Sequence, residues 1–165
     1  MGGWYVIYTK SRHEKKVYEQ LQMDGIESFL AIQKQLRKWS DRKKWVEVPL
    51  FSSYVFVSPT SRQIEQVLQV PGVVRYIMFN GRKAIVKPEE IEFLQKVYQE
   101  SISVEIVPES FEAQKLVKIT GGPFSGFTAR LLWCNDHGKA AVRIEEIGYS
   151  VIFQVSSLEI ASVAQ

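Results

Sequence analysis

The stretch over residues 46–57 most limits what this chain can fold into. It is rich in β-branched and aromatic side chains, which fit a pleated sheet, and it is too short to cross a membrane. Its single proline supplies no amide donor, so we expect two strand pieces that break near it. In the second piece, Val55 and Val57 share one face, and Tyr54 and Phe56 share the other. The β-branched pair suits a core, so the two rings either meet a helix of the same domain or form an aromatic patch for a partner.

A strongly basic run lies directly before this stretch. Residues 37–44 carry five Lys or Arg side chains and one acid. The flanking sequence predicts an extended hairpin over residues 34–48. The formal charge is +5 over residues 1–100 and −2 over residues 101–165. A basic first half can favour a polyanion, and a charged hairpin tip is also typical of a solvated surface.

Composition excludes several classes of protein. The chain has 165 residues, of which 45% are hydrophobic and 24% charged, enough for one domain plus a small module. No apolar run reaches the roughly 18 residues of a membrane helix, and we expect no membrane partner. No secretory signal is visible and Cys134 is the single cysteine, so a cytoplasmic protein is the simplest interpretation. His13 and His137 match no metal-ligand spacing and no nucleophile–base pattern is visible, so we expect neither a cofactor nor an enzyme.

The first hundred residues alternate between strand and helix patterns. Trp4–Tyr8 has the aromatic and β-branched composition of a strand. Ser11 and Glu14 predict a capping box at the start of a helix that Gly25 ends. Further expected elements are a strand over residues 26–32, a short helix with Ile64, Val67 and Leu68 inward, strands over residues 73–79 and 82–86 joined by an Asn80-Gly81 turn, and a helix beginning near Pro88. This order predicts an α+β fold, with helices flanking an antiparallel sheet.

The last third of the chain has a different texture. Residues 102–113 show no clear period and are interpreted as a linker. From Gln114 onward, strand patterns over residues 116–120, 128–135, 140–144 and 150–155 alternate with glycine-containing turns over residues 121–123 and 136–138 and at Gly148. About five strands in about fifty residues predict a small all-β barrel. We therefore expect a first domain over residues 1–101, a linker over residues 102–113 and a β-barrel domain over residues 114–165.

Two motifs now resemble known families. The turn between the first two strands of the second domain is similar to the KOW motif, carried here by Gly121, Gly122, Pro123, Phe124 and Gly126. Trp4–Tyr8, together with Pro49-Leu50-Phe51 and Tyr54–Val57, resembles the amino-terminal domain of NusG-type transcription elongation factors. A NusG-type domain followed by a linker and a KOW domain would span essentially the whole chain.

The resemblance implies two contacts for the first domain, one with RNA polymerase and one with DNA. In the family, an apolar face docks on the clamp helices of the largest subunit of RNA polymerase, a helix-in-groove mode. The matching positions, expected to bind RNA polymerase, are Leu50, Phe51, Tyr54 and Phe56. Single-stranded non-template DNA is read by residues after the first strand, where Lys and Arg can track phosphates and an aromatic ring or His can stack on a base. The matching positions, expected to bind DNA, are Tyr8, Lys10, Arg12 and His13, with Arg75 on a nearby strand; the alternative places Tyr8 in the core and leaves the cations solvated.

The resemblance is nearest to the specialised RfaH- and UpxY-like antiterminators, because of the compact first domain and the basic hairpin. It implies an operon-specific antitermination factor that suppresses pausing and termination, as for polysaccharide operons. The hairpin tip then lies near upstream DNA or is simply solvated. The KOW domain of relatives can contact a small-subunit ribosomal protein; Leu131, Leu132, Ile144 and Phe153 are the candidates here, with core packing as the alternative. The competing functions are a general NusG-like elongation factor and a KOW-containing RNA- or ribosome-binding protein.

Overall fold

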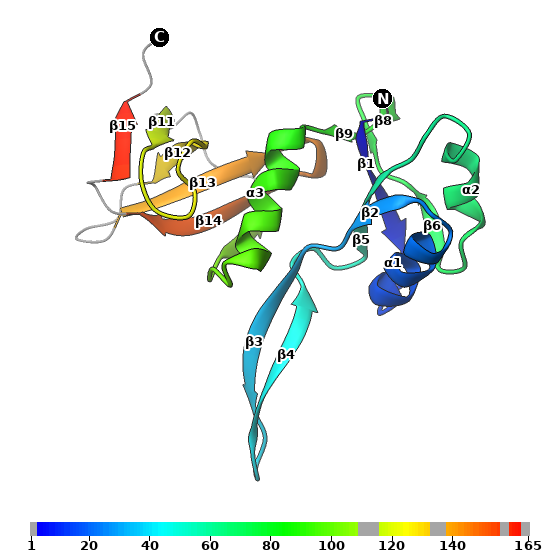
Figure 1. The fold of residues 1–165 in the computed structure, drawn as a ribbon, viewed down its shortest axis with the longest axis horizontal. Helices are drawn as coiled ribbons and strands as arrows, with labels where there is room; N and C mark the ends of the chain where they lie inside the picture. Colours follow the sequence, from blue (N-terminus) through cyan, green and yellow to red (C-terminus); the bar gives the residue numbers. More distant parts are fainter. Residues whose placement is uncertain (1–2, 109–115, 133–137, 156–158, 163–165) are drawn as a thin grey trace. The chain divides into compact units, whose positions relative to one another are not determined.

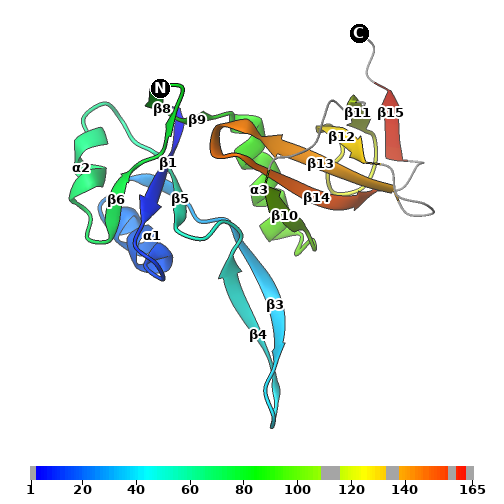
Figure 2. The same cartoon turned by 180° about the vertical axis from the view of Figure 1, so that it is seen from behind.

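The structure is a computed structural model that describes residues 3–108, 116–132, 138–155 and 159–162. The chain divides into two compact units, residues 1–91 and residues 92–165, each of which is described by itself. Figures 1 and 2 show the elements from two opposite sides. The predicted strand residues 133–135, the turn residues 136–137 and the end of the predicted linker at 109–113 lie outside the described residues.

The first unit is built on a five-stranded antiparallel sheet. Its central strand β1 (Trp4–Thr9) pairs with β5 (Tyr54–Ser58) on one side, and β5 pairs with β2 (Glu27–Phe29). On the other side, β1 pairs with β6 (Val73–Tyr76) and β9 (Ile85–Val86). The strand predictions at Trp4 and Tyr54 are therefore confirmed as the two middle strands of the sheet.

Two helices cover one face of this sheet. Helix α1 (Glu14–Met23) and helix α2 (Ile64–Gln69) supply core residues that pack with Ile7, Val55 and Val57 of the sheet. Val55 and Val57 thus occupy the core face, as their β-branched side chains predict. Leu68, expected to point inward, is instead 37% exposed.

The start of α1 differs from the predicted capping box. The residue before the helix is His13, and no side chain caps the first turn. Arg12 adopts a left-handed conformation, with φ of 64°, and directs the chain away from the geometry that would bring Ser11 to the helix start. At the other end, Gly25 has φ of 72° and ends the helix as predicted.

Two hairpins complete the first unit. Strands β3 (Ile32–Lys38) and β4 (Lys43–Pro49) pair over seven positions, which confirms the predicted basic hairpin. Strands β7 (Met78–Phe79) and β8 (Arg82–Lys83) are joined at Asn80-Gly81. Both turn residues have positive φ, 51° and 77°, as a two-residue hairpin turn requires.

The second unit contains a six-stranded antiparallel sheet in the order β10-β14-β13-β12-β11-β15. Helix α3 (Pro88–Gln99) reaches into this unit from Glu92 onward, and Phe93 stacks against Phe124 and Phe153 with ring centroids 4.6 and 5.4 Å apart. The strands are β10 (Glu105–Pro108), β11 (Leu116–Ile119), β12 (Thr128–Leu132), β13 (Gly138–Ile144), β14 (Tyr149–Val155) and β15 (Ile160–Ser162), with a short 3₁₀ turn η1 (Glu145–Ile147). The predicted α+β domain followed by an all-β domain is confirmed.

The predicted domain limits differ from this division. Glu105–Pro108 lies inside the stretch interpreted as a linker, yet it forms β10 and pairs with β14 over four positions. The division of the chain falls between residues 91 and 92 rather than near residue 101. The reason is packing, since the buried Phe93 ring belongs to the aromatic cluster of the second unit. Among the described residues, no helix is long and apolar enough to cross a membrane.

Candidate functional site

Three side chains form a row across the face of the first sheet that α1 and α2 do not cover. Tyr8 of β1 is paired with Tyr54 of β5 and with Arg75 of β6, so all three lie on the same face. The guanidinium carbon of Arg75 is 5.5 Å from the centre of the Tyr8 ring. Tyr8 meets Tyr54 edge to face, with centroids 6.3 Å apart. We call Tyr54, Tyr8 and Arg75 the Tyr8 row.

The Tyr8 row is accessible to solvent, although it lies on a strand whose neighbouring residues are buried. Tyr8 is 37% exposed and Tyr54 is half-buried, whereas Val6 and Ile7 of the same strand are fully buried. A guanidinium over a tyrosine ring is a favourable cation–π arrangement. The row therefore presents aromatic surface and a positive charge at one place, and the alternative in which Tyr8 is a core residue does not hold.

The segment after β1 brings further predicted DNA-binding residues to the end of this strand. Lys10 and Arg12 are exposed, and His13 is half-buried, with its Nδ1 2.9 Å from the Ser11 carbonyl oxygen. The Lys10 amide donates to the Gly72 carbonyl oxygen at 2.9 Å, which ties this segment to the turn before β6. The five predicted DNA-binding residues thus lie near the end of β1. Two of the five, Tyr8 and Arg75, belong to the Tyr8 row.

Two of the four described non-glycine residues with positive φ lie near the Tyr8 row, and the other two, Asn80 and Ser101, lie elsewhere. Arg12 and Ser53 both have positive φ, 64° and 66°, although neither is glycine. Such conformations cost of order 1 kcal/mol or more and persist where the surroundings impose them. Ser53 directly precedes Tyr54, and its carbonyl oxygen accepts from the Thr9 amide at 2.8 Å. Ser53 therefore adjoins Tyr54, and Arg12 lies four residues after Tyr8 in the segment that follows β1; such conformations occur at functional sites.

Gly72 is a supporting residue of the site that was not among the predicted site residues. Its φ is 98°, and a Cβ at this position would lie 2.9 Å from Val17 Cγ2 and 3.3 Å from His13 Cβ. Any side chain would therefore displace the start of α1. The Pro71-Gly72 pair is the sequence signal, because such pairs mark turns that need unusual backbone angles.

The four residues expected to bind RNA polymerase are not equally accessible. Leu50 and Tyr54 are half-buried, whereas Phe51 and Phe56 are 3% and 0% exposed. The Phe56 ring lies 6.1 Å from Phe51 and 6.1 Å from Phe29, centroid to centroid. In this conformation the two phenylalanines support the surface from beneath, and Leu50 and Tyr54 are the members that reach it.

On the face covered by the helices, Tyr76 is buried and hydrogen-bonded, unlike the exposed Tyr8. It is buried, and its hydroxyl donates to the Ile64 carbonyl oxygen at 2.7 Å. Burial, with smaller contributions from Glu65 and Tyr5, raises the pKa of Tyr76 to about 12. Tyr76 is therefore a structural tyrosine that holds α2 to the sheet.

The KOW-like turn of the second unit has a clear structural basis. Gly122 and Gly126 have positive φ, 76° and 96°, and the Gly126 amide donates to the Ile119 carbonyl oxygen at 2.8 Å. The turn directs Phe124 inward, where it is 4% exposed and lies 4.6 Å from the Phe153 ring. Gly121 and Pro123 complete the turn, and all five predicted motif residues are thus brought together between β11 and β12.

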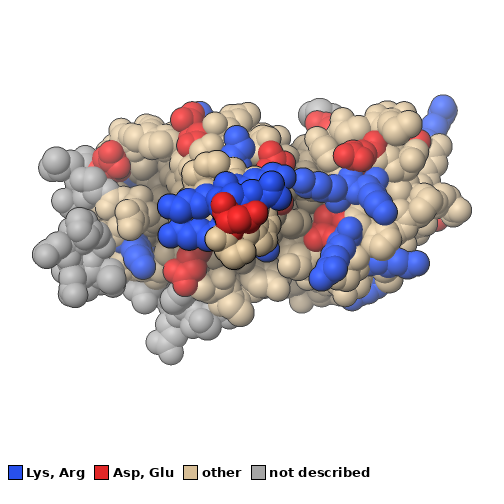
Figure 3. All heavy atoms as spheres, turned by 90° about the horizontal axis from the view of Figure 1, so that it is seen from below, with Lys and Arg blue, Asp and Glu red and all other residues tan. Residues whose placement is uncertain are grey.

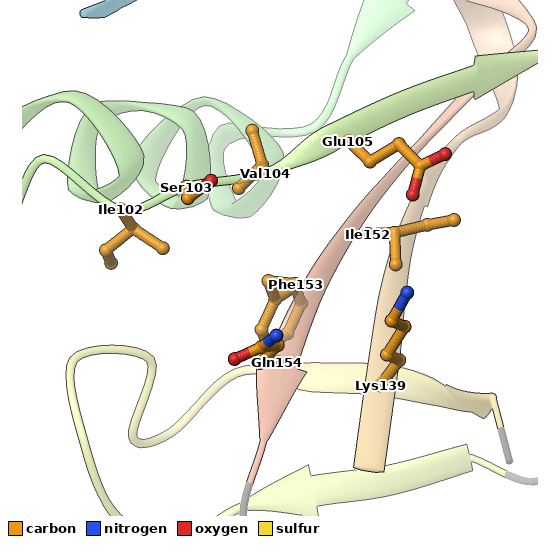
Figure 4. Close-up of a pocket in the computed structure, with 8 residues that line it drawn as sticks. All are labelled: Ile102, Ser103, Val104, Glu105, Lys139, Ile152, Phe153 and Gln154. Carbon is orange, nitrogen blue, oxygen red and sulfur yellow. The ribbon is translucent and has the colours of Figure 1, made fainter. Parts of the chain in front are cut away.

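The second unit also contains a shallow hollow, shown in Figure 4. It has a volume of about 360 Å³ and is lined by Ile102–Glu105 on one side and by Lys139 and Ile152–Gln154 on the other. Ile152 lies between the Glu105 carboxylate and the Lys139 amine (Figure 4), and among the described residues these two groups form no ion pair.

Two of the apolar residues that were candidates for a ribosomal contact serve packing instead, since Ile144 and Phe153 are buried. Within the described ranges, no group of His, Cys, Asp or Glu could hold a metal ion.

Comparisons with known proteins agree with this architecture. The family model described as transcription termination factor NusG matches residues 2–95. The transcription termination/antitermination protein NusG of Halalkalibacterium halodurans is 28% identical, over 76% of this chain and 78% of that protein. A solved structure concerning domain interaction in Thermotoga maritima NusG has a TM-score of 0.57 at 22% identity and covers 99% of this chain and 98% of that one, which shows a shared fold. Since the family model spans more than half of the sequence, the chain belongs to the NusG family of transcription termination factors.

Proposed function

We propose that this chain is an elongation and antitermination factor that holds RNA polymerase and exposed non-template DNA with one surface of its first unit. NusG proteins are transcription factors that bind RNA polymerase, not enzymes. The observation that carries the proposal is the Tyr8 row, in which the surface expected for polymerase and the surface expected for DNA meet at the Tyr8–Tyr54 contact. One rigid pair of strands would then position both contacts.

The polymerase contact in this proposal is the clamp helices of the largest subunit. Leu50 and Tyr54 supply the accessible apolar surface, and the Phe51–Phe56 ring pair keeps that surface in place. An amphipathic helix can pack its apolar face against such a surface while its own charged face stays in solvent. Phe51 and Phe56 act here as supporting residues.

The DNA contact in this proposal is an unpaired base with its phosphates. Tyr8 offers a ring for stacking, and Arg75 adds a planar cation above it. Lys10 and Arg12, both exposed, provide the charge that follows the backbone, and His13 lies at the end of the same segment. Stacking on one base is worth about 1–3 kcal/mol, which changes affinity by about fivefold to more than a hundredfold.

We also propose that recruitment is operon-specific, in the manner of RfaH- and UpxY-like factors for polysaccharide operons. A base-reading surface on the first unit is what such recruitment requires. A general NusG-like factor would rely on the polymerase contact alone. The two possibilities therefore differ in how strongly binding depends on the exposed strand.

The polymerase contact is tested by exchanging its two accessible side chains. Binding of the Leu50→Ala/Tyr54→Ala variant to a reconstituted elongation complex from the host is measured beside that of the unchanged protein. The matched control is Leu68→Ala/Tyr98→Ala, which removes a leucine and a tyrosine of 37% and 38% exposure at other places on the chain. We expect the first variant to lose at least tenfold in affinity and the control to lose none. Equal affinities for both variants would contradict the proposed contact.

A further inference from the structure

Strand β14 of the second unit is only partly covered along one of its edges. It runs over Tyr149–Val155 and pairs with β13 at all seven positions. Strand β10 covers the other edge only opposite residues 149–152, because β10 begins at Glu105. Among the described residues, residues 153–155 therefore have no strand beside them on that edge. Successive residues of a strand direct their amide and carbonyl groups to alternate edges, so at least one of these three residues faces the open side.

The hollow of the second unit lies beside this open edge. Figure 4 shows residues 102–104 on one side of it, with Phe153 and Gln154 of β14 on the other. Its volume of about 360 Å³ is at the lower end of the range for binding pockets, about 300–1,000 Å³. A strand rises about 3.4 Å per residue, so the open part of β14 matches a strand of about 10 Å. The hollow thus combines room for a short strand with backbone groups that can bind one.

Strand pairing decides which side chains an added strand would meet. Lys139 of β13 is paired with Gln154, so both lie on the face of the sheet that also carries Ile152. Phe153 points to the opposite face, where its ring lies 4.6 Å from the Phe124 ring. A residue placed opposite Gln154 would therefore continue the row formed by Lys139 and Gln154, and its two neighbours would lie on the face of Phe153.

Lys139 is one of five Lys and Arg residues in positions 101–165, a stretch with a formal charge of −2. Lys and Arg gather instead on the first unit, where the β3–β4 hairpin points toward the viewer in Figure 3. Lys139 is half-buried, and in the described part of the chain it forms no ion pair with a carboxylate. The Glu105 carboxylate lies on the far side of Ile152 from the Lys139 amine (Figure 4). Because charges attract more strongly away from bulk water, this amine favours an acidic side chain in its own row.

We propose that the hollow binds an extended segment of a partner protein, which adds to the open edge of β14 as a short antiparallel strand. In this mode of recognition the main chain supplies affinity, and alternate side chains supply specificity. The middle residue lies opposite Gln154 and is acidic, because strands are spaced about 4.8 Å apart and a lysine two strands away can reach it. The flanking residues lie opposite Phe153 and Val155 and are apolar. The recognised sequence is therefore apolar–acidic–apolar.

This inference goes beyond the proposed function, because the site lies in the second unit and needs neither RNA polymerase nor DNA. It also differs from a contact made by the apolar side chains of the barrel. Phe153 contributes its backbone here, while its ring stays buried. Specificity comes from Lys139, which is paired with the exposed Gln154.

The test is a nitrogen-15 NMR titration of the full chain with a short peptide that has valine–glutamate–valine at its centre and serine and glycine elsewhere. A second peptide has lysine in place of the glutamate. We expect the glutamate peptide to bind at least about fivefold more tightly and to shift the amide signals of residues 102–105 and 153–155. Equal affinities of the two peptides, no binding of the glutamate peptide at millimolar concentration, or shifts confined to other parts of the sheet would overturn the proposal.

Variants of Lys139 test the charge. Lys139→Gln should abolish the preference for the glutamate peptide, and Lys139→Glu should reverse it in favour of the lysine peptide. The matched control is Lys118→Glu, at an exposed lysine of β11, which should leave the preference unchanged. The same loss of preference in the control and in the Lys139 variants would contradict a site at Lys139.

Modified peptides test the addition of a strand. Two glutamate peptides are N-methylated at alternate amides, one in each register. Only one of them should lose binding, because every second amide of an added strand faces β14. Equal affinities of the two methylated peptides would contradict an added strand. Since no polymerase or DNA is present in these experiments, their failure would leave the proposed function unaffected.

Discussion

The two faces of the five-stranded sheet are formed by alternate residues of the same strands, yet they differ in exposure and charge where β1 ends at Tyr8. On the face covered by α1 and α2, Ile7 is fully buried and the Tyr76 hydroxyl is bonded to a backbone carbonyl. On the other face, Tyr8 is 37% exposed, with the Arg75 guanidinium over its ring and the Tyr54 ring beside it. The second face is also buried at Val6 and Phe56, but around Tyr8 and Arg75 it keeps exposed aromatic surface and charge, which stability alone does not explain.

The largest expected effect separates neighbouring residues on the two faces. Ile7→Ala should lower the free energy of unfolding by about 3 kcal/mol, because it leaves a cavity in a fully buried site. Tyr8→Ala should cost less than half of that, because much of its ring already contacts solvent. Chemical denaturation of both variants measures the difference. Comparable losses from the two variants would mean that both faces are core.

The second prediction uses the pKa of Tyr76. Tyr76→Phe should cost about 1 kcal/mol at neutral pH through loss of the hydrogen bond to Ile64. Because the folded pKa of Tyr76 is raised from 10.0 to about 12, its stabilising contribution is complete below pH 10 and is lost as pH rises through 12. The advantage of the unchanged protein over the variant should therefore be constant below pH 10, narrow above it and reverse before pH 12, because a rise of two pKa units outweighs one hydrogen bond. A stability difference that does not change with pH up to 12 would contradict the raised pKa of Tyr76.

The third prediction is a substitution after β1 that should stabilise the protein rather than destabilise it. Arg12→Gly should raise the free energy of unfolding by up to about 1 kcal/mol, because glycine adopts positive φ without strain. The same change should weaken binding of single-stranded DNA, since the guanidinium is lost. Arg12→Ala is the matched control, as it removes the charge but keeps the strain, and it should show no gain in stability. A stability loss from the glycine variant would place Arg12 among structural residues.

The smallest expected effect concerns the hairpin. Lys43→Glu places an acid opposite Lys38 and should stabilise the hairpin by about 0.5 kcal/mol. Lys43→Gln removes the repulsion without adding an attraction and should lie between the two. Hydrogen exchange of the hairpin amides reports the local stability. Faster exchange in the Lys43→Glu variant would show that the paired cations do not oppose the fold.

Local patterns predicted the elements of the first unit well. Alternation along residues 54–57 placed Val55 and Val57 in the core, and Asn80-Gly81 located a hairpin turn because both residues tolerate positive φ. The basic run at residues 37–44 likewise indicated the β3–β4 hairpin. These features depend on neighbours in the sequence, so the sequence contains the information that decides them.

Features decided by distant neighbours were not predictable in the same way. Alternation cannot reveal that Phe56 is also buried, because its ring meets Phe29 and Phe51 from other segments. Glu105–Pro108 has no period of its own, and it becomes a strand only because β14 offers a pairing edge. Of the candidate site, the residue types were visible in the sequence, but the contact between Tyr8 and Arg75 depends on the register of two strands.

The most direct test of the proposed function compares elongation complexes with an intact and a gapped non-template strand. We expect the unchanged protein to bind the gapped complex at least tenfold more weakly, and Tyr8→Ala to bind both complexes at that weaker level. Such a result would support one surface that holds polymerase and reads the exposed strand. Equal affinity of the unchanged protein for the two complexes would contradict the DNA contact and indicate a general factor held by polymerase alone.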